Sequence, residues 1–422
     1  MAADVSGSRG IRRRVRGLSG NVLALSLVSL LNDTSSEIIY PLLPAFLVLT
    51  LGASPFAIGV IEGFAESVAS LLKLVSGYLS DRLHRRKLPV FLGYSLASLT
   101  RPLLAFVSSW PQVLAVRVTD RIGKGIRGAP RDALLAASVP VESRGFAFGF
   151  NRAADHLGAV FGPVIAYLLL SWIASDPSEP TAREYQNVFL YASAPVVVGL
   201  FVIVFFVKEH RPATIGIAAP RLSFSLEGFD RSFKRFLIVI AVFTLSNSTD
   251  AFLLLRAESS GIAPAQLPLL WMVLHLSKVV SSLAGGHLSD TLGRRRMIVA
   301  GWTVYALVYV GFAFVTTAWQ AWALFIVYGV YFGLTEGVEK AFVADMVPDD
   351  KRGTAFGLYN LAFGITVLPA SLLFGAVWSA FGASAAFLLS AAISVAAAAL
   401  LFTVRAPRAD EQQKDGPEGP PS

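Results

Sequence analysis

Cysteine is absent from this chain of 422 residues, and histidine occurs only five times. The chain therefore has no disulfide framework, no thiolate metal site and no cysteine nucleophile, and its scattered histidines give no pair of metal ligands. No G-x-x-x-x-G-K-[ST] loop is present to hold a nucleotide phosphate. These absences argue against an enzyme and against an ATP-driven pump, and we expect no metal and no cofactor.

Charged residues are also scarce, at 15%, whereas hydrophobic residues make up 54% and the mean hydropathy is +0.61. A soluble globular protein has a more polar composition. Twelve apolar segments are each long enough to cross a hydrocarbon layer of about 30 Å as an α-helix. We therefore predict an all-α polytopic protein embedded in the lipid bilayer, with spans at residues 21–48, 55–79, 88–108, 111–137, 145–172, 186–207, 236–256, 265–288, 297–316, 319–345, 353–379 and 383–404.

The net charge of +8 does not indicate nucleic-acid binding, because the cations form no single exposed stripe and lie at the ends of apolar segments. Alternate loops carry 21 Lys and Arg residues, and the opposite set carries only Arg183. By the positive-inside rule, we expect both termini to be cytoplasmic. The predicted location is the cell (inner or plasma) membrane, and we expect a monomer.

A charged stretch occurs twice, 209 residues apart, as GYLSDRLHRRK from Gly77 and GHLSDTLGRRR from Gly286. A second pair of related stretches, starting at Pro140 and Pro348, has nearly the same offset. Such a period indicates two copies of one unit. We predict a cytoplasmic segment at residues 1–20, six-helix bundles at 21–207 and 236–405, a cytoplasmic linker at 208–235 and a disordered tail at 406–422.

The doubled stretch resembles the signature between the second and third helices of the major facilitator superfamily of secondary transporters, which recurs in weaker form between helices eight and nine. His84 stands where that family usually has glycine. The resemblance implies two pseudo-symmetric bundles that alternate access to a central site. It also implies a cytoplasmic gate, to which we assign the motif residues Gly77, Asp81, Arg82 and Asp290.

Two further motifs resemble the same family. Arg121-Ile122-Gly123-Lys124-Gly125 is similar to its fourth-helix motif R-x-x-Q-G, with Lys124 in place of Gln. The resemblance implies a role in proton coupling for Arg121. The stretch Gly158 to Pro163 is similar to the fifth-helix motif of proton-coupled drug antiporters but lacks its trailing glycines, and helix packing explains these residues equally well.

Ionisable residues inside the predicted spans need a partner or a wet cavity, because burying an unpaired charge in hydrocarbon is costly. Asp33 and Glu37 are four residues apart and share one helix face. We predict a role in proton coupling or in lining a central cavity for Asp33, Glu37, Arg121, Asp155, Asp250 and Glu336.

The basic stripe of the fourth span has two interpretations, an anion or proton pathway and a set of internal ion pairs. Near balance of charges in the first half favours pairing, and we assign Lys124, Arg127, Arg131 and Asp132 to a cytoplasmic gate. By the repeat, Arg131 and Asp132 align with Glu339 and Lys340, which carry the opposite charges. We predict that these residues pair across the two halves when the cytoplasmic side closes.

Some aromatic residues share a helix face with a polar residue inside the membrane, and most aromatics in such proteins only pack helices or face lipid. We name Tyr40, Trp271 and Phe332 as candidates for lining a substrate cavity.

The leading hypothesis is a secondary transporter that works by alternating access, with protons as the driving ion and export of a small organic molecule as its activity. One alternative is uptake or exchange of an organic anion or a phosphorylated metabolite. Another is a membrane receptor that transports nothing.

Overall fold

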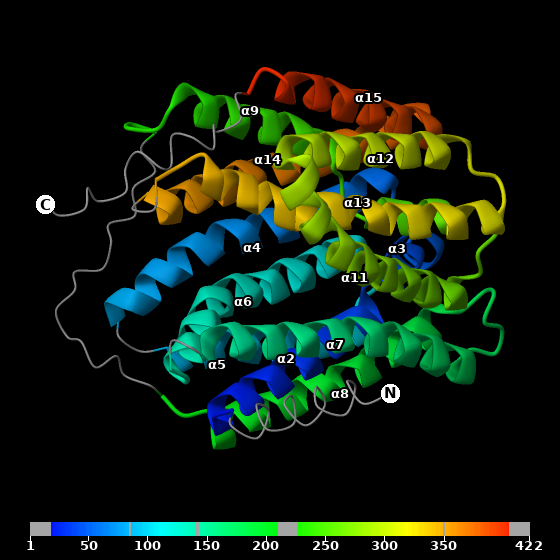
Figure 1. Cartoon of the computed structure of the whole chain (residues 1–422). Helices are drawn as coiled ribbons and strands as arrows, with labels where there is room; N and C mark the ends of the chain where they lie inside the picture. Colours follow the sequence, from blue (N-terminus) through cyan, green and yellow to red (C-terminus); the bar gives the residue numbers. More distant parts are fainter. Residues whose placement is uncertain (1–17, 84–85, 141–142, 210–225, 349–350, 405–422) are drawn as a thin grey trace, which may run out of the picture.

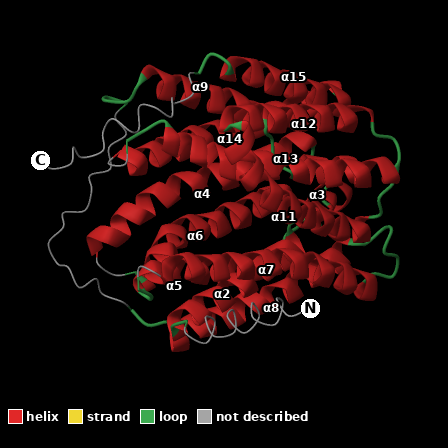
Figure 2. Cartoon of the chain, viewed as in Figure 1, coloured by secondary structure: helices red, strands yellow, loops and turns green. Residues whose placement is uncertain are grey.

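The computed structural model describes residues 18–83, 86–140, 143–209, 226–348 and 351–404. Within these ranges every regular element is a helix (Figures 1 and 2). The elements are α2 (Gly20–Ile39), α3 (Leu43–Ala45), η1 (Phe46–Thr50), α4 (Pro55–Leu83), α5 (Lys87–Thr100), η2 (Arg101–Phe106), α6 (Trp110–Ala137), α7 (Arg144–Ile173), α8 (Ala182–Phe206), α9 (Arg231–Ser246), α10 (Ala251–Glu258), η4 (Pro264–Gln266), α11 (Leu267–Leu292), α12 (Arg294–Phe314), α13 (Ala318–Asp345), α14 (Arg352–Phe381) and α15 (Ala383–Leu401).

These helices confirm the predicted all-α fold, and each of the twelve predicted spans coincides with one helix or with two or three consecutive ones. In the described part of the chain, ten helical segments are long and apolar enough to cross a membrane. The other two predicted spans correspond to α6 and α11. Both are as long as their neighbours, at 28 and 26 residues, but carry ionisable side chains in their middle.

The helices pack as two sets. In the first, α2 lies against α7 and α8, and α6 lies against α4 and α5; in the second, α13 lies against α11 and α12, and α15 lies against α9 and α12. We interpret these sets as the two predicted halves and call them the N set (α2 to α8) and the C set (α9 to α15). The most extensive contacts between them join α4 to α14 and α7 to α11.

The contact between α4 and α14 depends on small residues. A Cβ built on Gly63 would lie 3.0 Å from the Cβ of Ser371, and one built on Gly375 would lie 2.9 Å from the carbonyl oxygen of Pro55. Ser67 Oγ also donates a hydrogen bond to the Gly364 carbonyl oxygen, at 2.6 Å. Close approach of helices at small residues is a common packing mode inside membranes.

Two helices are broken at equivalent places in the two sets. The first break, between α2 and α3, contains Pro41, which has no N–H to donate; the second, between α9 and α10, leaves residues 247–250 non-helical. Tyr40 Oη lies 3.3 Å from Thr249 Oγ1, and these positions are 209 residues apart, the offset of the sequence repeat. Contact between equivalent positions is expected next to a twofold axis.

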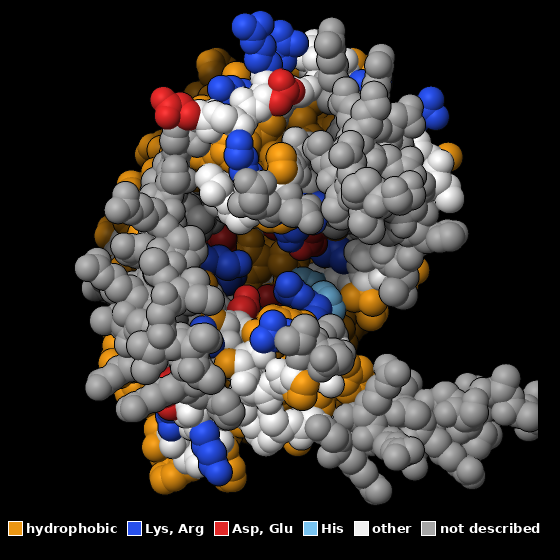
Figure 3. Space-filling model, turned by 60° about the vertical axis from the view of Figure 1, so that its left-hand side comes forward, with side chains coloured by type: hydrophobic (Ala, Val, Ile, Leu, Met, Phe, Trp, Pro, Cys, Tyr) orange, Lys and Arg blue, Asp and Glu red, His pale blue; other side chains and the backbone are white. Residues whose placement is uncertain are grey.

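The space between the sets is open at one end. We call the end with residues 207–209 and 226–230 the linker end, and the other the opposite end. Figure 3, which brings the linker end forward, shows a hollow lined by acidic, basic and histidine side chains. At the opposite end one apolar core unites both sets, with Leu43, Phe46 and Ile58 of the N set and Phe252 and Leu253 of the C set.

Candidate transport site

Glu37 on α2 joins the two sets. Its Oε2 accepts a hydrogen bond of 2.6 Å from the indole Nε1 of Trp271 on α11, and His275 Nε2 lies 3.9 Å from the same oxygen. The rings of Tyr40 and Trp271 lie 4.9 Å apart between centroids. We call Glu37, Tyr40, Trp271, His275 and Thr249 the inter-set bridge, because these contacts connect α2 to α9–α11 between the hollow and the opposite end.

A second cluster lies on the C set. Asp250, in the break between α9 and α10, accepts a 2.7 Å hydrogen bond from Tyr328 Oη and lies 3.9 Å from Lys278 Nζ. Lys278 Nζ also lies 3.5 Å from the ring centroid of Phe332 and 5.6 Å from that of Trp271. A cation placed over aromatic rings and beside a carboxylate is stabilised by both.

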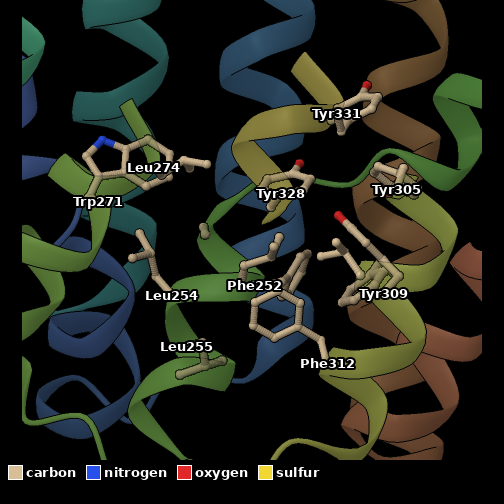
Figure 4. Close-up of a cluster of buried hydrophobic side chains, with 14 of the residues drawn as sticks. Phe252, Leu254, Leu255, Trp271, Leu274, Tyr305, Tyr309, Phe312, Tyr328 and Tyr331 are labelled. Atoms are coloured by element: carbon tan, nitrogen blue, oxygen red, sulfur yellow. The ribbon is translucent and has the colours of Figure 1, made fainter. Parts of the chain in front are cut away.

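Tyrosines from α12 and α13 hydrogen-bond residues at the break of the C set, one of them through a backbone carbonyl group. Tyr305 Oη donates to the Ser246 carbonyl oxygen, and Asn247 Nδ2 donates to Tyr331 Oη. Figure 4 shows Tyr305, Tyr309, Tyr328 and Tyr331 gathered on one side of this region. Such side chains allow a helix to be interrupted within a membrane protein because they replace the missing backbone partners.

Most of the basic stripe on α6 is paired inside the N set. Arg117 makes two hydrogen bonds to Glu62, at 3.0 and 2.8 Å, with both side chains buried. Arg101 Nε, from η2, lies 3.0 Å from Asp120 Oδ1. These pairs confirm the internal-pairing interpretation for part of the stripe, since a buried charge is tolerated when it is paired and hydrogen-bonded.

Two members of that stripe that we assigned to the gate, Arg127 and Lys124, lie in different surroundings. Arg127 is buried beside Asn32, whose Oδ1 accepts its Nη2 at 3.2 Å, and lies 4.5 Å over the Tyr94 ring. Lys124 is exposed and has no ion pair or hydrogen bond in the part of the chain that the structure describes. Arg127 is thus buried within the N set whereas Lys124 is exposed, and their assignment to a gate stays a prediction.

Asp33, Arg121 and Asp155 all lie inside the bundle. Arg121 Nη2 pairs with Glu66 Oε1 at 2.9 Å, and its Nε is buried without a partner among the described residues. Asp33 accepts a 2.9 Å hydrogen bond from Asn32, and Asp155 Oδ1 lies 3.9 Å from Arg131 Nη1. Arg121 is buried and Asp33 and Asp155 are half-buried, so none of these three side chains is fully exposed.

Comparison with known proteins gives the family. The Major Facilitator Superfamily profile matches residues 25–255 and 235–422. An uncharacterized MFS-type transporter from Methanocaldococcus jannaschii is 34% identical over 374 residues, covering 86% of this chain and 89% of the relative. The chain belongs to the major facilitator superfamily. It is therefore a multi-pass membrane transporter and not an enzyme.

Other superfamily members are more distant. The multidrug resistance protein MdtG of Serratia proteamaculans is 26% identical over 397 residues, covering 88% of this chain and 90% of the relative. Among solved structures, a bacterial homologue of the human lysosomal transporter Spinster, in an inward-facing and occupied conformation, has a TM-score of 0.74 at 16% identity. That comparison covers 92% of this chain and 97% of the other, and it shows the shared fold.

The predicted gate of this superfamily member is only partly described. The predicted motif residues Gly77, Asp81 and Arg82 belong to α4, which runs through Leu83. Their surroundings, and those of Asp290, lie outside what the structure describes. Arg131 Nη2 contacts Asp132 at 3.0 Å, and Glu339 accepts hydrogen bonds from Trp302 and Tyr359. Lys340 Nζ lies 3.8 Å from Glu336.

All of these partners belong to the same set as the residue they contact. With the hollow open, the structure does not bring Arg131 and Glu339 together, and their pairing on closure stays a prediction. Glu336 and Lys340 are both exposed, and the predicted role of Glu336 in coupling or in lining a cavity stays a prediction.

Three features of the site were missed from the sequence. The break at residues 247–250 contains no proline, and the polar run Asn247 to Asp250 is the sequence feature that could have indicated it. Trp271 was named as a cavity residue but is only 4% exposed, because it packs in the bridge. The roles of Lys124 and Lys278 depend on which neighbours reach them, and helix periodicity does not give those neighbours.

Proposed function

We propose that this chain is a proton-coupled secondary transporter that exports a small organic molecule by alternating access. The observation that carries the proposal is the combination of a charged hollow open at the linker end with a bridge that closes the opposite end. A central site reached from one side at a time is how secondary transporters of this architecture work. In the proposed cycle the bridge separates and the linker end closes.

Glu37 is the proposed proton carrier. It accepts the Trp271 N–H at 2.6 Å and lies 3.9 Å from the nearer nitrogen of His275. A proton on Glu37 removes the charge that strengthens this hydrogen bond, so proton binding changes the free-energy difference between the bridged and separated states. Asp33 and Asp155 are further candidates, because both are carboxylates inside the bundle and next to the hydrogen-bonding partners described above.

The direction and sidedness rest on sequence. The excess of Lys and Arg in the loops at the linker end puts that end, and both termini, in the cytoplasm. The open hollow is then reached from the cytoplasm, where an exported substrate enters. The stretch from Gly158 to Pro163, which is similar to the motif of drug antiporters, and the relative named as a multidrug resistance protein support export.

Uptake of an organic anion is the second candidate. It is favoured by Lys124, which is exposed and has no ion-pair partner in the described part of the chain. A cis,cis-muconate transport protein of Acinetobacter baylyi, 22% identical over 339 residues, supports the same candidate.

The test uses the full chain in proteoliposomes that contain a pH-sensitive dye. Vesicles are loaded in turn with benzoate, cis,cis-muconate or tetraphenylphosphonium, and diluted into medium without it. Exchange against protons acidifies the lumen as the substrate leaves, whereas transport together with protons makes it alkaline. Saturable binding without any flux or pH change would indicate a receptor and overturn the proposal.

Glu37→Gln is the test of the proton carrier. We expect this variant to keep exchange of labelled substrate between the two sides while losing the pH change. The control is Asp176→Asn, which alters an exposed carboxylate on the loop before α8. A normal pH change in Glu37→Gln would show that another group carries the proton.

A further inference from the structure

Lys124 lies on α6 between two residues that pack closely against neighbouring helices. A Cβ built on Gly123 would lie 2.5 Å from the Gly93 carbonyl oxygen of α5, and one built on Gly125 would lie 2.6 Å from Leu72 Cβ of α4. The residues on either side of Lys124 are thus fixed against two neighbouring helices. Its own side chain is exposed, although α6 lies within the bundle.

The other cations at this level have partners. Arg117 is bound by Glu62 at 2.8 Å, and Arg121 by Glu66 at 2.9 Å. Lys124 has no ion pair or hydrogen bond among the described residues. Charged residues of both signs act on it, namely Arg121 and Arg127 of α6, Glu66 of α4 and Asp33 of α2. Its positive charge is therefore left for water or for a ligand in the hollow.

Lys278 occupies the place beside aromatic rings and a carboxylate that would suit an organic cation. Lys278 Nζ lies 3.5 Å from the Phe332 ring centroid and 3.9 Å from Asp250 Oδ2. Aromatic faces beside a carboxylate form the usual site for an ammonium group. At that place a cationic substrate has to displace Lys278 from these contacts, whereas an anionic one meets at Lys124 an ammonium group that pairs with no described residue.

We propose that the transported molecule is a small organic anion and that Lys124 binds its carboxylate or another acidic group. This inference rests on the proposed transport function and names its substrate class. Lys124 replaces the water around it with a charge-assisted hydrogen bond to the anion, which is stronger than a neutral hydrogen bond. Its position on α6, within electrostatic range of Glu37, places the bound anion near the inter-set bridge.

Binding to the purified full chain in detergent tests this assignment without requiring flux. Affinities are measured by titration calorimetry for benzoate, cis,cis-muconate, benzenesulfonate and glycerol phosphate, with tetraphenylphosphonium as the cation. We expect at least one anion to bind. Lys124→Gln should weaken that binding about tenfold or more, the usual effect of losing a hydrogen bond to a charged group, while Lys124→Arg should retain most of it.

The matched control is Lys73→Gln, which removes another exposed lysine, on α4. It should leave anion affinity unchanged. The proposal is overturned if Lys124→Gln binds the anion as well as the unmodified chain, if only tetraphenylphosphonium binds, or if no anion of the panel binds. Anion binding through Lys124 without flux in proteoliposomes would overturn the transport proposal and leave this assignment standing.

Discussion

Removing the indole N–H that joins the two helix sets should shift the protein toward the state that opens at the opposite end. In the structure Trp271 Nε1 donates to Glu37 Oε2 at 2.6 Å, from α11 of the C set to α2 of the N set. Trp271→Phe keeps an aromatic ring beside Tyr40 but removes the donor. The bridged state then loses a hydrogen bond that the separated state does not have.

The size of the shift follows from the kind of bond. A hydrogen bond to a charged group contributes about 1.5 to 3 kcal/mol. Because each 1.4 kcal/mol changes an equilibrium constant tenfold, the ratio of bridged to separated molecules should fall by about tenfold to a hundredfold. The absence of cysteine from the chain lets two introduced cysteines carry the only spin labels.

The labels are placed at Glu179 and Ser259, which are exposed on loops of different sets at the opposite end. Pulsed electron paramagnetic resonance then reports the distance between the loops, and Trp271→Phe should populate a longer distance. Trp302→Phe is the matched control, because Trp302 donates a 3.0 Å hydrogen bond to Glu339 within the C set. Equal distance distributions in both variants and the unmodified chain would refute the bridge.

Three further predictions concern packing and charge. A Cβ on Gly59 of α4 would collide with the carbonyl oxygen of Ser371 on α14, so Gly59→Leu should prevent the close contact of these helices and abolish transport, while the variant still inserts into the membrane. Normal transport would show that the two helices need not touch. Glu62→Gln should destabilise the chain by about 3 to 5 kcal/mol, because it leaves the buried Arg117 unpaired. The double variant Glu62→Met, Arg117→Met should recover much of this loss. Thermal unfolding in detergent measures both effects. Exchanging the charges of Arg131 and Glu339 together should restore transport lost by either change alone, and failure of that rescue would remove their pairing from the closing of the linker end.

Several features were predictable from the sequence because they depend on local composition and on repetition. The length of each apolar segment is fixed by the thickness of the membrane, so the predicted spans agree with helices such as α7 and α14 to within a few residues at each end. The offset of 209 between the charged stretches predicts two copies of one unit. That the cations of α6 form ion pairs was predictable from the sequence, because buried charges need partners.

The partners themselves were not predictable from the sequence. Lys124 and Arg127 are three residues apart on one helix, yet Arg127 is buried beside Asn32 and Lys124 is exposed. The difference arises because α5 and α2 cover one face of α6 and the hollow lies on another. Sequence periodicity gives the angle between two side chains, and the identity of what they face depends on helices from elsewhere in the chain.

The sequence alone determined that this chain crosses the membrane many times, because that property follows from hydropathy. From internal repetition it also predicted two related units, and from the cost of burying charge it predicted that the ionisable residues of the spans avoid lipid. Only the tertiary structure decided that Glu37 meets Trp271, that Tyr40 meets its repeat equivalent Thr249 and that Lys124 has no partner among the residues that the structure describes. Those contacts depend on how the two helix sets pack against each other at the opposite end, and no short stretch of sequence determines that packing.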